Sequence, residues 1–253
     1  GNYNALHFAY PKIDWIKFSK NFVSSFDFEF SLATTQINPS EDIIEFFQAI
    51  QRINGIILDL NQDFWRYISD GWFGLKSAKD EVGSSTMPQK INPIDFENSE
   101  GNLELANGLI EVFTRKLAVS RLQRDLSGST ILRNIGTVLG FCLLAYKNTS
   151  AGISKISVNE NKILEDLNSD WSILSEALQI VLRKEGVKDS FSKVLSVTKG
   201  RHFGKEEWQK LIKKLKISKE NKQKLLALTP QTYTGIADKL TSRVVKGRLK
   251  NRL

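Results

Sequence analysis

The sequence predicts an all-α protein, in which a bundle of long helices is followed by a smaller helical domain. Two observations support this fold class. Apolar residues recur at helical spacing over long stretches of the first part of the chain, and no stretch shows the alternation of a half-buried strand. From about residue 158 onward the helical patterns become shorter, and turn residues separate them. We therefore expect a long-helix bundle over residues 1–154 and a small helical domain over residues 155–253.

The first two helical patterns cover residues 14–26 and 40–69. The first predicts a short helix. The second keeps a broad apolar stripe over its whole length and predicts one long helix with a wide buried face. A glycine inside a helix costs about 1 kcal/mol relative to alanine, so Gly55 indicates a place where another helix approaches closely. We expect Gly71 and Gly74 to end this helix.

Two further long helices are predicted over residues 95–118 and 129–149, with Gly152 at the end of the second. The second is apolar on nearly all sides, and a helix without a polar face is buried in a folded protein. We therefore expect the bundle to be completed by further helices, from the same protein or from neighbouring subunits. Cys142 is the only cysteine, and it lies in this apolar pattern as a packing residue.

The second domain is expected to contain five shorter helices, over residues 161–168, 171–185, 189–198, 206–214 and 219–227. Its end is strongly basic. From residue 199 onward there are 16 Lys and Arg against 4 Asp and Glu, whereas residues 1–198 carry 20 against 24.

This basic tail has two interpretations. Lysines with aromatic residues between them can bind nucleic acid, and the aromatic residues here are Phe203, Trp208 and Tyr233. We favour a solvated helical face, because the lysines lie at helical spacing opposite a group of apolar residues. These are Leu211, Ile212 and Leu215.

Composition limits the function classes. Two histidines and one cysteine exclude a metal site built from several histidines or cysteines within this chain, and they exclude an internal disulfide. No apolar run approaches the roughly 20 residues that span a bilayer. We expect a cytoplasmic protein that does not bind membranes.

A short run rich in polar residues connects two of the long helical patterns. It reads Gly83-Ser-Ser-Thr-Met-Pro-Gln-Lys-Ile-Asn-Pro93 and is called the serine loop below. Two adjacent hydroxyl groups follow a glycine, and successive backbone N–H groups in a turn-like path can bind an anion beside the ammonium group of Lys90. The combination suits a carboxylate or a developing oxyanion. The alternative is a plain polar connector, because loops are polar by default.

The order of residues in the serine loop is more specific than its composition. The pattern Gly-Ser-Ser-x-Met-Pro-x-Lys-x-Asn-Pro resembles the active-site loop of the fumarase/aspartase superfamily of elimination enzymes. The resemblance implies that Ser84 is the base that removes a proton from the carbon next to a carboxylate. It places Ser85 and Lys90 at the carboxylates of the substrate. Met87 and Asn92 are also expected to contact the substrate.

A second chemically suited segment, called the arginine turn below, covers residues 121–134 and reads Arg-Leu-Gln-Arg-Asp-Leu-Ser-Gly-Ser-Thr-Ile-Leu-Arg-Asn. Its three arginines surround a Ser- and Gly-rich turn that opens a helix, and guanidinium groups and helix N-terminal N–H groups both bind phosphate. The alternative is a set of exposed arginines that satisfy helix ends.

The arginine turn resembles the adenylosuccinate lyase branch of the superfamily. So do Asp-Phe-Glu-Asn at residues 95–98 and the opening Gly-Asn-Tyr-Asn-Ala. The resemblance implies that Gln36 and Asn98 bind the substrate. It assigns the nucleotide to four residues of the turn, of which Ser129 and Arg133 would bind its phosphate. These four are Arg124, Ser129, Thr130 and Arg133.

The resemblance also implies an activity and an assembly. Members of that branch cleave adenylosuccinate to AMP and fumarate, and the succinylated aminoimidazole carboxamide ribotide SAICAR to AICAR and fumarate. They use no metal or redox cofactor. We expect the same reactions here, in a homotetramer whose active sites each draw on three chains. Residues 1–154 would form the C-terminal part of the central domain of the superfamily.

The departing nitrogen also needs an acid. In the family it is a histidine upstream of the matched region, and the resemblance places Gly1 near the middle of a full-length member. We therefore expect the 253-residue chain to be inactive alone. His7 is a poor substitute, because family members tend to have histidine one place earlier, where this chain has Leu6. His202 lies in the basic tail and is expected to be a surface residue.

Two other function classes remain open. A catalytically silent structural homologue would keep the bundle, but Ser84, Lys90 and Arg133 are all present and argue against it. A basic helical protein that binds nucleic acid would explain the tail but not the serine loop. We expect no nucleic-acid partner.

Overall fold

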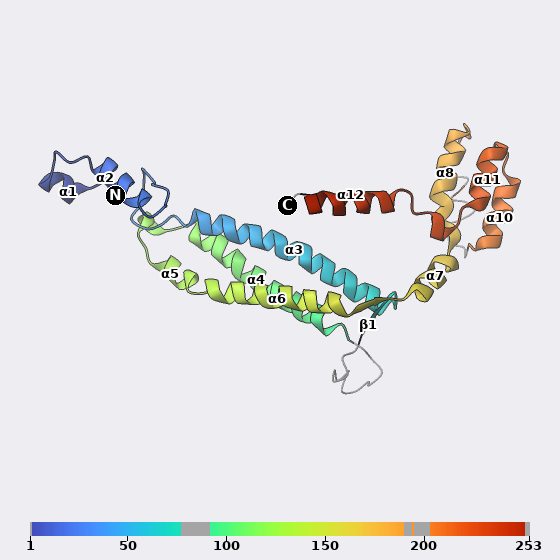
Figure 1. Ribbon diagram of the computed structural model, residues 1–253, viewed down its shortest axis with the longest axis horizontal. Helices are drawn as coiled ribbons and strands as arrows, with labels where there is room; N and C mark the ends of the chain where they lie inside the picture. Colours follow the sequence, from blue (N-terminus) through green and yellow to red (C-terminus); the bar gives the residue numbers. More distant parts are fainter. Residues whose placement is uncertain (1, 77–91, 190–193, 195–202, 251–253) are drawn as a thin grey trace. The chain divides into compact units, whose positions relative to one another are not determined.

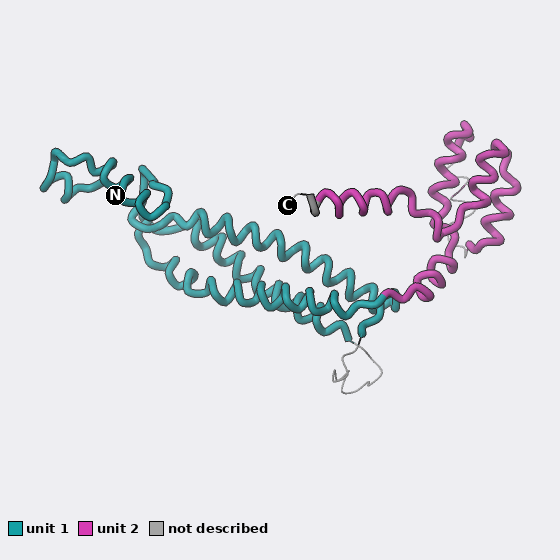
Figure 2. The backbone as a smooth tube through the Cα atoms, in the orientation of Figure 1, with its two compact units in different colours: residues 1–157 teal, residues 158–253 magenta. Residues whose placement is uncertain are grey.

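The computed structural model describes residues 2–76, 92–189, 194 and 203–250. The chain divides into two compact units, Gly1–Ser157 and Val158–Leu253 (Figure 2). The described residues form helices and one two-stranded sheet. The predicted all-α fold class is therefore confirmed.

The first unit is built on three long helices, α3 (Glu41–Ser69), α4 (Ile94–Leu117) and α6 (Ile135–Lys155). Helix α4 packs along both α3 and α6 (Figure 1). The strands β1 (Phe73–Leu75) and β2 (Ile156–Val158) pair just after the ends of α3 and α6. The shorter elements of the unit are α1 (Asn4–Ala9), α2 (Trp15–Ser24), the 3-10 helix η1 (Arg121–Gln123) and α5 (Ser127–Leu132).

The helices predicted over residues 14–26, 40–69 and 95–118 are confirmed as α2, α3 and α4. The helix predicted over residues 129–149 has the wrong boundaries. The chain breaks between α5 and α6, and α6 continues beyond Gly152 to the end of the bundle. Helix α1 and the two strands were not predicted, because elements of six and three residues are too short for a periodic pattern.

The glycines of the bundle differ in their roles. Gly71 follows the end of α3 as expected, with a φ of 76° in the left-handed region that favours glycine. Gly74 lies just beyond it in β1. Gly55 does not mark a close approach, since no atom lies within 4 Å of the position that its Cβ would take. The close approach is at Gly152, where a Cβ would lie 2.7 Å from Cζ of Phe96.

Replacing Gly152 with alanine should destabilise the protein by about 1–3 kcal/mol, the usual cost of overpacking a filled core. The Phe96 ring has little room to move, because it is 1% exposed and stacks on Phe64 with ring centroids 5.2 Å apart. Urea unfolding followed by circular dichroism measures the change. The control is Gly55→Ala in α3, where no atom lies within 4 Å of the Cβ position. It should be neutral or stabilising, and equal effects of both changes would contradict the prediction.

The apolar core of the first unit lies between α3, α4 and α6. At its centre the rings of Phe47 and Phe113 meet edge to face, with centroids 5.0 Å apart. Cys142 is buried beside them, in the packing role expected for it. The other buried members are Ile44, Ala106, Ile110, Leu117 and Val138.

Two buried polar layers cross the same bundle and join its three helices. In the first, Nδ2 of Asn54 donates to Oδ1 of Asn107 at 2.9 Å, and the hydroxyl of Tyr146 donates to Oδ1 of Asn54 at 2.6 Å. Burial raises the pKa of Tyr146 to about 12, so its hydroxyl stays a donor. An unpaired buried polar group costs about 1–3 kcal/mol. Sliding one helix along its axis would break these bonds, so the layers fix the positions of the helices along their axes. The second layer is a ring of three side chains bonded at 2.8–2.9 Å, Asn61, Ser99 and Thr149.

Two apolar faces of the bundle are exposed within this unit. Helix α6 buries one face only, so the complete burial predicted for it does not hold within this chain alone. By length and composition the segment Ser127–Lys155 could cross a membrane, although its buried face belongs to the bundle core. The α6 stripe consists of Leu139, Leu143, Leu144 and Ile153. The α3 stripe follows the three-and-four spacing of a helix seam through Phe46, Ala49, Ile53, Ile56 and Leu60.

The second unit contains short helices around its own core. The helices predicted over residues 161–168, 206–214 and 219–227 are confirmed as α7, α10 and α11, and residues 171–185 form η2 followed by α8. The helix predicted over residues 189–198 lies mostly outside the described residues, and α12 was not predicted. The bounds are α7 (Glu160–Ser169), η2 (Trp171–Leu174), α8 (Ser175–Lys184), α10 (Lys205–Lys214), α11 (Lys219–Ala227), η3 (Pro230–Thr232) and α12 (Ala237–Lys250).

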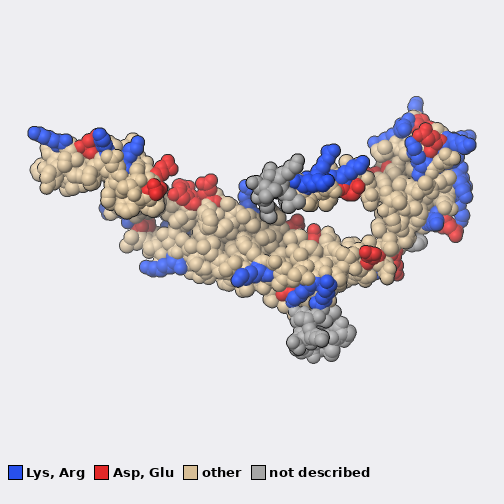
Figure 3. Space-filling model, viewed as in Figure 1, with Lys and Arg blue, Asp and Glu red and all other residues tan. Residues whose placement is uncertain are grey.

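Two aromatic residues of the basic tail lie in the core of this unit. Trp208 is buried and donates through Nε1 to the carbonyl oxygen of Leu225 at 2.9 Å, and Phe203 packs beside it. Ile212 of α10 is also buried, whereas Lys and Arg side chains lie outside over α8, α10 and α11 (Figure 3). The rings of Phe203 and Trp208 are therefore not free to stack on nucleic-acid bases.

Candidate functional site

The serine loop contributes few described residues. Ser84, Ser85, Met87 and Lys90 lie outside them, so their roles stay predictions. Asn92 is described and lies two residues before the start of α4. It is half-buried, and its carbonyl oxygen accepts a hydrogen bond from the first N–H of α4 at 2.9 Å.

Lys155, the last residue of α6, interacts with the chain before and after residues 77–91. The N–H of Lys76 donates to the carbonyl oxygen of Lys155 at 2.8 Å, and Nζ of Lys155 forms an ion pair with Asp95 at 2.8 Å. Lys155 thus contacts both sides of the segment that contains the predicted base. Asn98 lies exposed near this end of α4.

The arginine turn follows α4, at the other end of the bundle. Leu122 and Gln123 both have a φ of 51°, in the left-handed region. A residue other than glycine held there costs on the order of 1–3 kcal/mol, and such strain persists only where surrounding bonds hold it. Strained backbone of this kind is enriched at functional sites.

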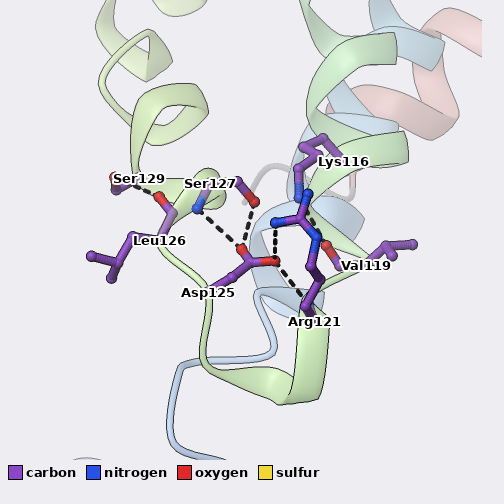
Figure 4. A network of polar contacts seen from close by, with 7 residues as sticks. All are labelled: Lys116, Val119, Arg121, Asp125, Leu126, Ser127 and Ser129. Carbon is purple, nitrogen blue, oxygen red and sulfur yellow. Dashed lines mark hydrogen bonds and ion pairs between the residues drawn. The ribbon is translucent and has the colours of Figure 1, made fainter.

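Asp125 makes bonds that hold this turn (Figure 4). Its carboxylate accepts from the N–H of Arg121 at 2.9 Å, from the N–H of Ser127 at 3.1 Å and from the Ser127 hydroxyl at 2.5 Å. Nη1 of Arg121 lies 3.5 Å from the same carboxylate. The bond from the Ser127 hydroxyl, followed by that from the Arg121 N–H, holds the pKa of Asp125 well below its usual range. The carboxylate is therefore ionised at neutral pH.

Arg124 and Arg133 are the two arginines of the turn whose side chains are available to contact a ligand. Both are exposed, and neither forms an ion pair with any described residue. Ser129 and Thr130 are exposed in α5. The Ser129 hydroxyl donates to the carbonyl oxygen of Leu126 at 2.8 Å, so it must rotate to donate to a phosphate. Helix α5 has only six residues, so the arginine side chains supply most of the positive charge here.

A cavity of about 180 Å³ lies between the arginine turn, the end of α4 and the segment before α3. Asn38, Ser120 and Ser129 are among its lining residues. The Oγ of Ser120 is buried and has no hydrogen-bond partner among the described residues, and such a group is normally met by water or a ligand. Gln36 is exposed two residues before Asn38. The structure therefore places the Gln36 segment near the arginine turn.

The structure does not bring the other described candidate residues to this end. Asn92 and Asn98 lie at the start of α4, whereas the arginine turn follows its last residue, Leu117 (Figure 1). At a rise of about 1.5 Å per residue, α4 separates the two groups by roughly 30 Å. The described candidate residues of this chain therefore form two groups, one at each end of the bundle, called the two partial sites below.

Sequence reasoning missed three residues at these partial sites. The sequence pattern gives Asp125 no role of its own, although Asp and Ser two residues apart often form local hydrogen bonds in turns. Ser120 and Lys155 carry no such signal, because their positions depend on how α4 and α6 pack. Within the described residue ranges, no three His, Cys, Asp or Glu side chains lie together as metal ligands would.

Comparison with known proteins covers nearly the whole chain. The family model described as "Adenylosuccinate lyase C-terminal" matches residues 120–234, and the model described as "Lyase" matches residues 1–107. Adenylosuccinate lyase from Haemophilus influenzae is 48% identical over 244 residues, which are 96% of this chain and 54% of that enzyme. The corresponding enzyme of Buchnera aphidicola (subsp. Baizongia pistaciae) is 47% identical over 240 residues, 95% of this chain and 52% of the enzyme. The chain spans about half the length of these relatives.

A solved structure supports the fold. The crystal structure of 3-carboxy-cis,cis-muconate lactonizing enzyme from Pseudomonas putida superposes with a TM-score of 0.71 and 19% sequence identity. The match covers 100% of this chain and 57% of that one. At this identity the likeness concerns the fold alone.

Proposed function

The chain belongs to the adenylosuccinate lyase family of the fumarase/aspartase superfamily, and from this we propose that it is part of an enzyme that cleaves adenylosuccinate to AMP and fumarate. We propose SAICAR, cleaved to AICAR and fumarate, as its second substrate. The observation that carries the proposal is the arginine turn, in which Arg124 and Arg133 are exposed and form no ion pair with a described residue. The proposed enzyme works in the cytoplasm without a metal or redox cofactor.

In the proposed reaction Ser84 removes a proton from the carbon next to a carboxylate of the succinyl group. The negative charge that develops on that carboxylate must be met by donors already in place, a role we assign to Ser85 and Lys90. Met87 and Asn92 complete this part of the site. A serine hydroxyl is a weak base at its ordinary pKa, so the same positive surroundings must also stabilise its alkoxide.

The other ligand groups are assigned to the remaining predicted residues. Gln36 and Asn98 contact the substrate, and Ser129, Thr130 and Arg133 bind the nucleotide with Arg124. The proton for the departing nitrogen comes from a histidine outside these 253 residues, as the resemblance implies. His7 is exposed in α1, and His202 lies outside the described residues.

We further propose that each active site is assembled from several copies in a homotetramer. The two partial sites of one bundle lie roughly 30 Å apart along α4, so one copy does not complete a site from them. The α3 stripe and the α6 stripe supply apolar surfaces of the kind that a neighbouring subunit covers. Antiparallel packing of a helix of one copy on the stripe of another would bring one copy's arginine turn toward the end of another copy's bundle where α4 begins.

The direct test is the release of fumarate from adenylosuccinate by the assembled enzyme that contains this chain. Turnover of adenylosuccinate and SAICAR with production of AMP and AICAR supports the proposal. An assembled enzyme that binds neither product and releases no fumarate would leave the silent homologue as the better interpretation.

Changing Arg133 to lysine should weaken AMP binding about 10-fold or more and leave fumarate binding within about 2-fold, because an ammonium group cannot form the two parallel bonds of a guanidinium group on phosphate. Calorimetry with each ligand measures both constants. Arg183→Lys is the matched control, since Arg183 is an exposed arginine of α8 in the second unit, and AMP affinity should change little. Equal losses for AMP and fumarate at Arg133 would remove the phosphate assignment.

A further inference from the structure

We propose that Asp125 is a positioning residue for nucleotide binding, which holds the arginine turn in the strained conformation that presents Arg124. The inference rests on the proposed function, because it concerns how the same site keeps its shape. It assigns to Asp125 no contact with the substrate.

The bonds of Asp125 enclose the strained residues. The N–H groups that it binds belong to Arg121 and Ser127, one on each side of the left-handed pair Leu122 and Gln123. Arg124 lies inside the same closed segment. Loss of these bonds would let the pair relax to ordinary backbone angles, and the direction of the Arg124 side chain would change with it.

The negative charge of Asp125 allows two roles to be distinguished, repulsion of the ligand and positioning of the turn. A carboxylate close to a phosphate site repels the ligand, so a residue that acted only through its charge would weaken binding. Here the carboxylate is directed into its own turn, where it accepts three hydrogen bonds and faces the guanidinium group of Arg121 (Figure 4). A repelling charge and a positioning residue predict opposite results when the charge is removed.

The test is Asp125→Asn, which keeps the size of the side chain and removes the charge. An amide cannot accept from both sides of the turn, because its NH2 group only donates. In the assembled enzyme AMP binding should weaken about 10-fold or more, and fumarate binding should stay within about 2-fold, as measured by calorimetry. The KM for adenylosuccinate should rise correspondingly.

The chain offers a matched control in the second unit. Asp170 accepts from the N–H of Ser172 at 2.8 Å and from its hydroxyl at 2.7 Å, which is the same Asp-x-Ser arrangement. Asp170→Asn should leave AMP and fumarate affinity unchanged. A second variant, Ser127→Ala, keeps the Asp125 charge and removes the 2.5 Å bond, so AMP affinity should fall by a smaller factor of about three.

The outcomes separate the two proposals. Equal or tighter AMP binding by Asp125→Asn would overturn the positioning role, while normal AMP binding and turnover in the unmodified enzyme would still support the proposed function. An unmodified enzyme that binds no AMP would overturn the proposed function and this inference with it. If Asp125→Asn does not fold, Ser127→Ala decides, and unchanged AMP affinity in that variant overturns the inference.

Discussion

Replacing Ser84 with alanine should reduce the turnover of adenylosuccinate by roughly 1,000-fold, the contribution that a positioned general base makes to a proton transfer. The affinity for AMP should stay within a few-fold, because loss of the base affects the transition state more than ground-state binding. Steady-state kinetics and calorimetry on the assembled enzyme measure the two effects. This is the most direct test of the chemistry that the serine loop implies.

The same change at a hydroxyl with only a local bond provides the control. Ser154 donates to the carbonyl oxygen of Ala151 within α6 at 2.7 Å, so Ser154→Ala should leave turnover close to normal. Turnover near the normal rate in Ser84→Ala would assign the base to another residue. A fall in AMP affinity as large as the fall in rate would mean that Ser84 binds the nucleotide instead.

Replacing Ile56 with lysine should break the assembly and reduce turnover about 100-fold at low protein concentration. Ile56 is 72% exposed in this chain, at the middle of the α3 stripe, so the substitution costs little in an isolated copy. Between subunits it would bury an unpaired charge, at a cost of several kcal/mol. About 3 kcal/mol corresponds to roughly 100-fold in an association constant. Light scattering gives the mass of the assembly, and fumarate release gives the activity.

Ile180→Lys is the matched control for this prediction. Ile180 is also an exposed isoleucine on a helix, 55% exposed on α8, but it lies in the second unit and outside the stripe. It should leave both mass and turnover unchanged. A normal tetramer with normal activity in Ile56→Lys would show that the α3 stripe faces solvent or another part of the protein.

Helix positions were predictable where burial repeats with the helical period. Apolar side chains of α3 and α4 recur along one face, so these helices were expected close to their observed ends. Helix α12 lacks this signal. No buried residue is described in it, and its apolar residues lie exposed among lysines and arginines.

The role of a glycine could not be read from the sequence. Gly55 and Gly152 both interrupt an apolar pattern, but only Gly152 lies against a neighbouring ring. The difference arises from where α4 crosses α6, and a crossing point depends on every side chain between two helices. The sequence contains only a weak indication of the two polar layers. Asn54 and Asn61 are seven residues apart, so they lie on the same side of a helix.

The sequence predicts the candidate site as a set of residues but not as a geometry. The patterns around Ser84 and Arg133 predict two groups of residues, yet they did not indicate that α4 keeps Asn92 and Asn98 apart from the arginine turn. They also did not reveal the strained backbone at Leu122 and Gln123, because no residue there favours a positive φ. Helix length and backbone strain follow from packing and hydrogen bonding, which a list of residues does not contain.

The buried polar layers have a consequence for motion. A slide of α4 by one helical turn, about 5.4 Å, would separate Asn107 from Asn54 and Ser99 from Asn61 at the same time. Every such displacement leaves several buried polar groups without partners, so the three helices respond to a force at one end as a rigid body. If a site is shared between copies as proposed, rotation of whole bundles against one another would widen or narrow it, and the amplitude would grow with distance from the axis of that rotation.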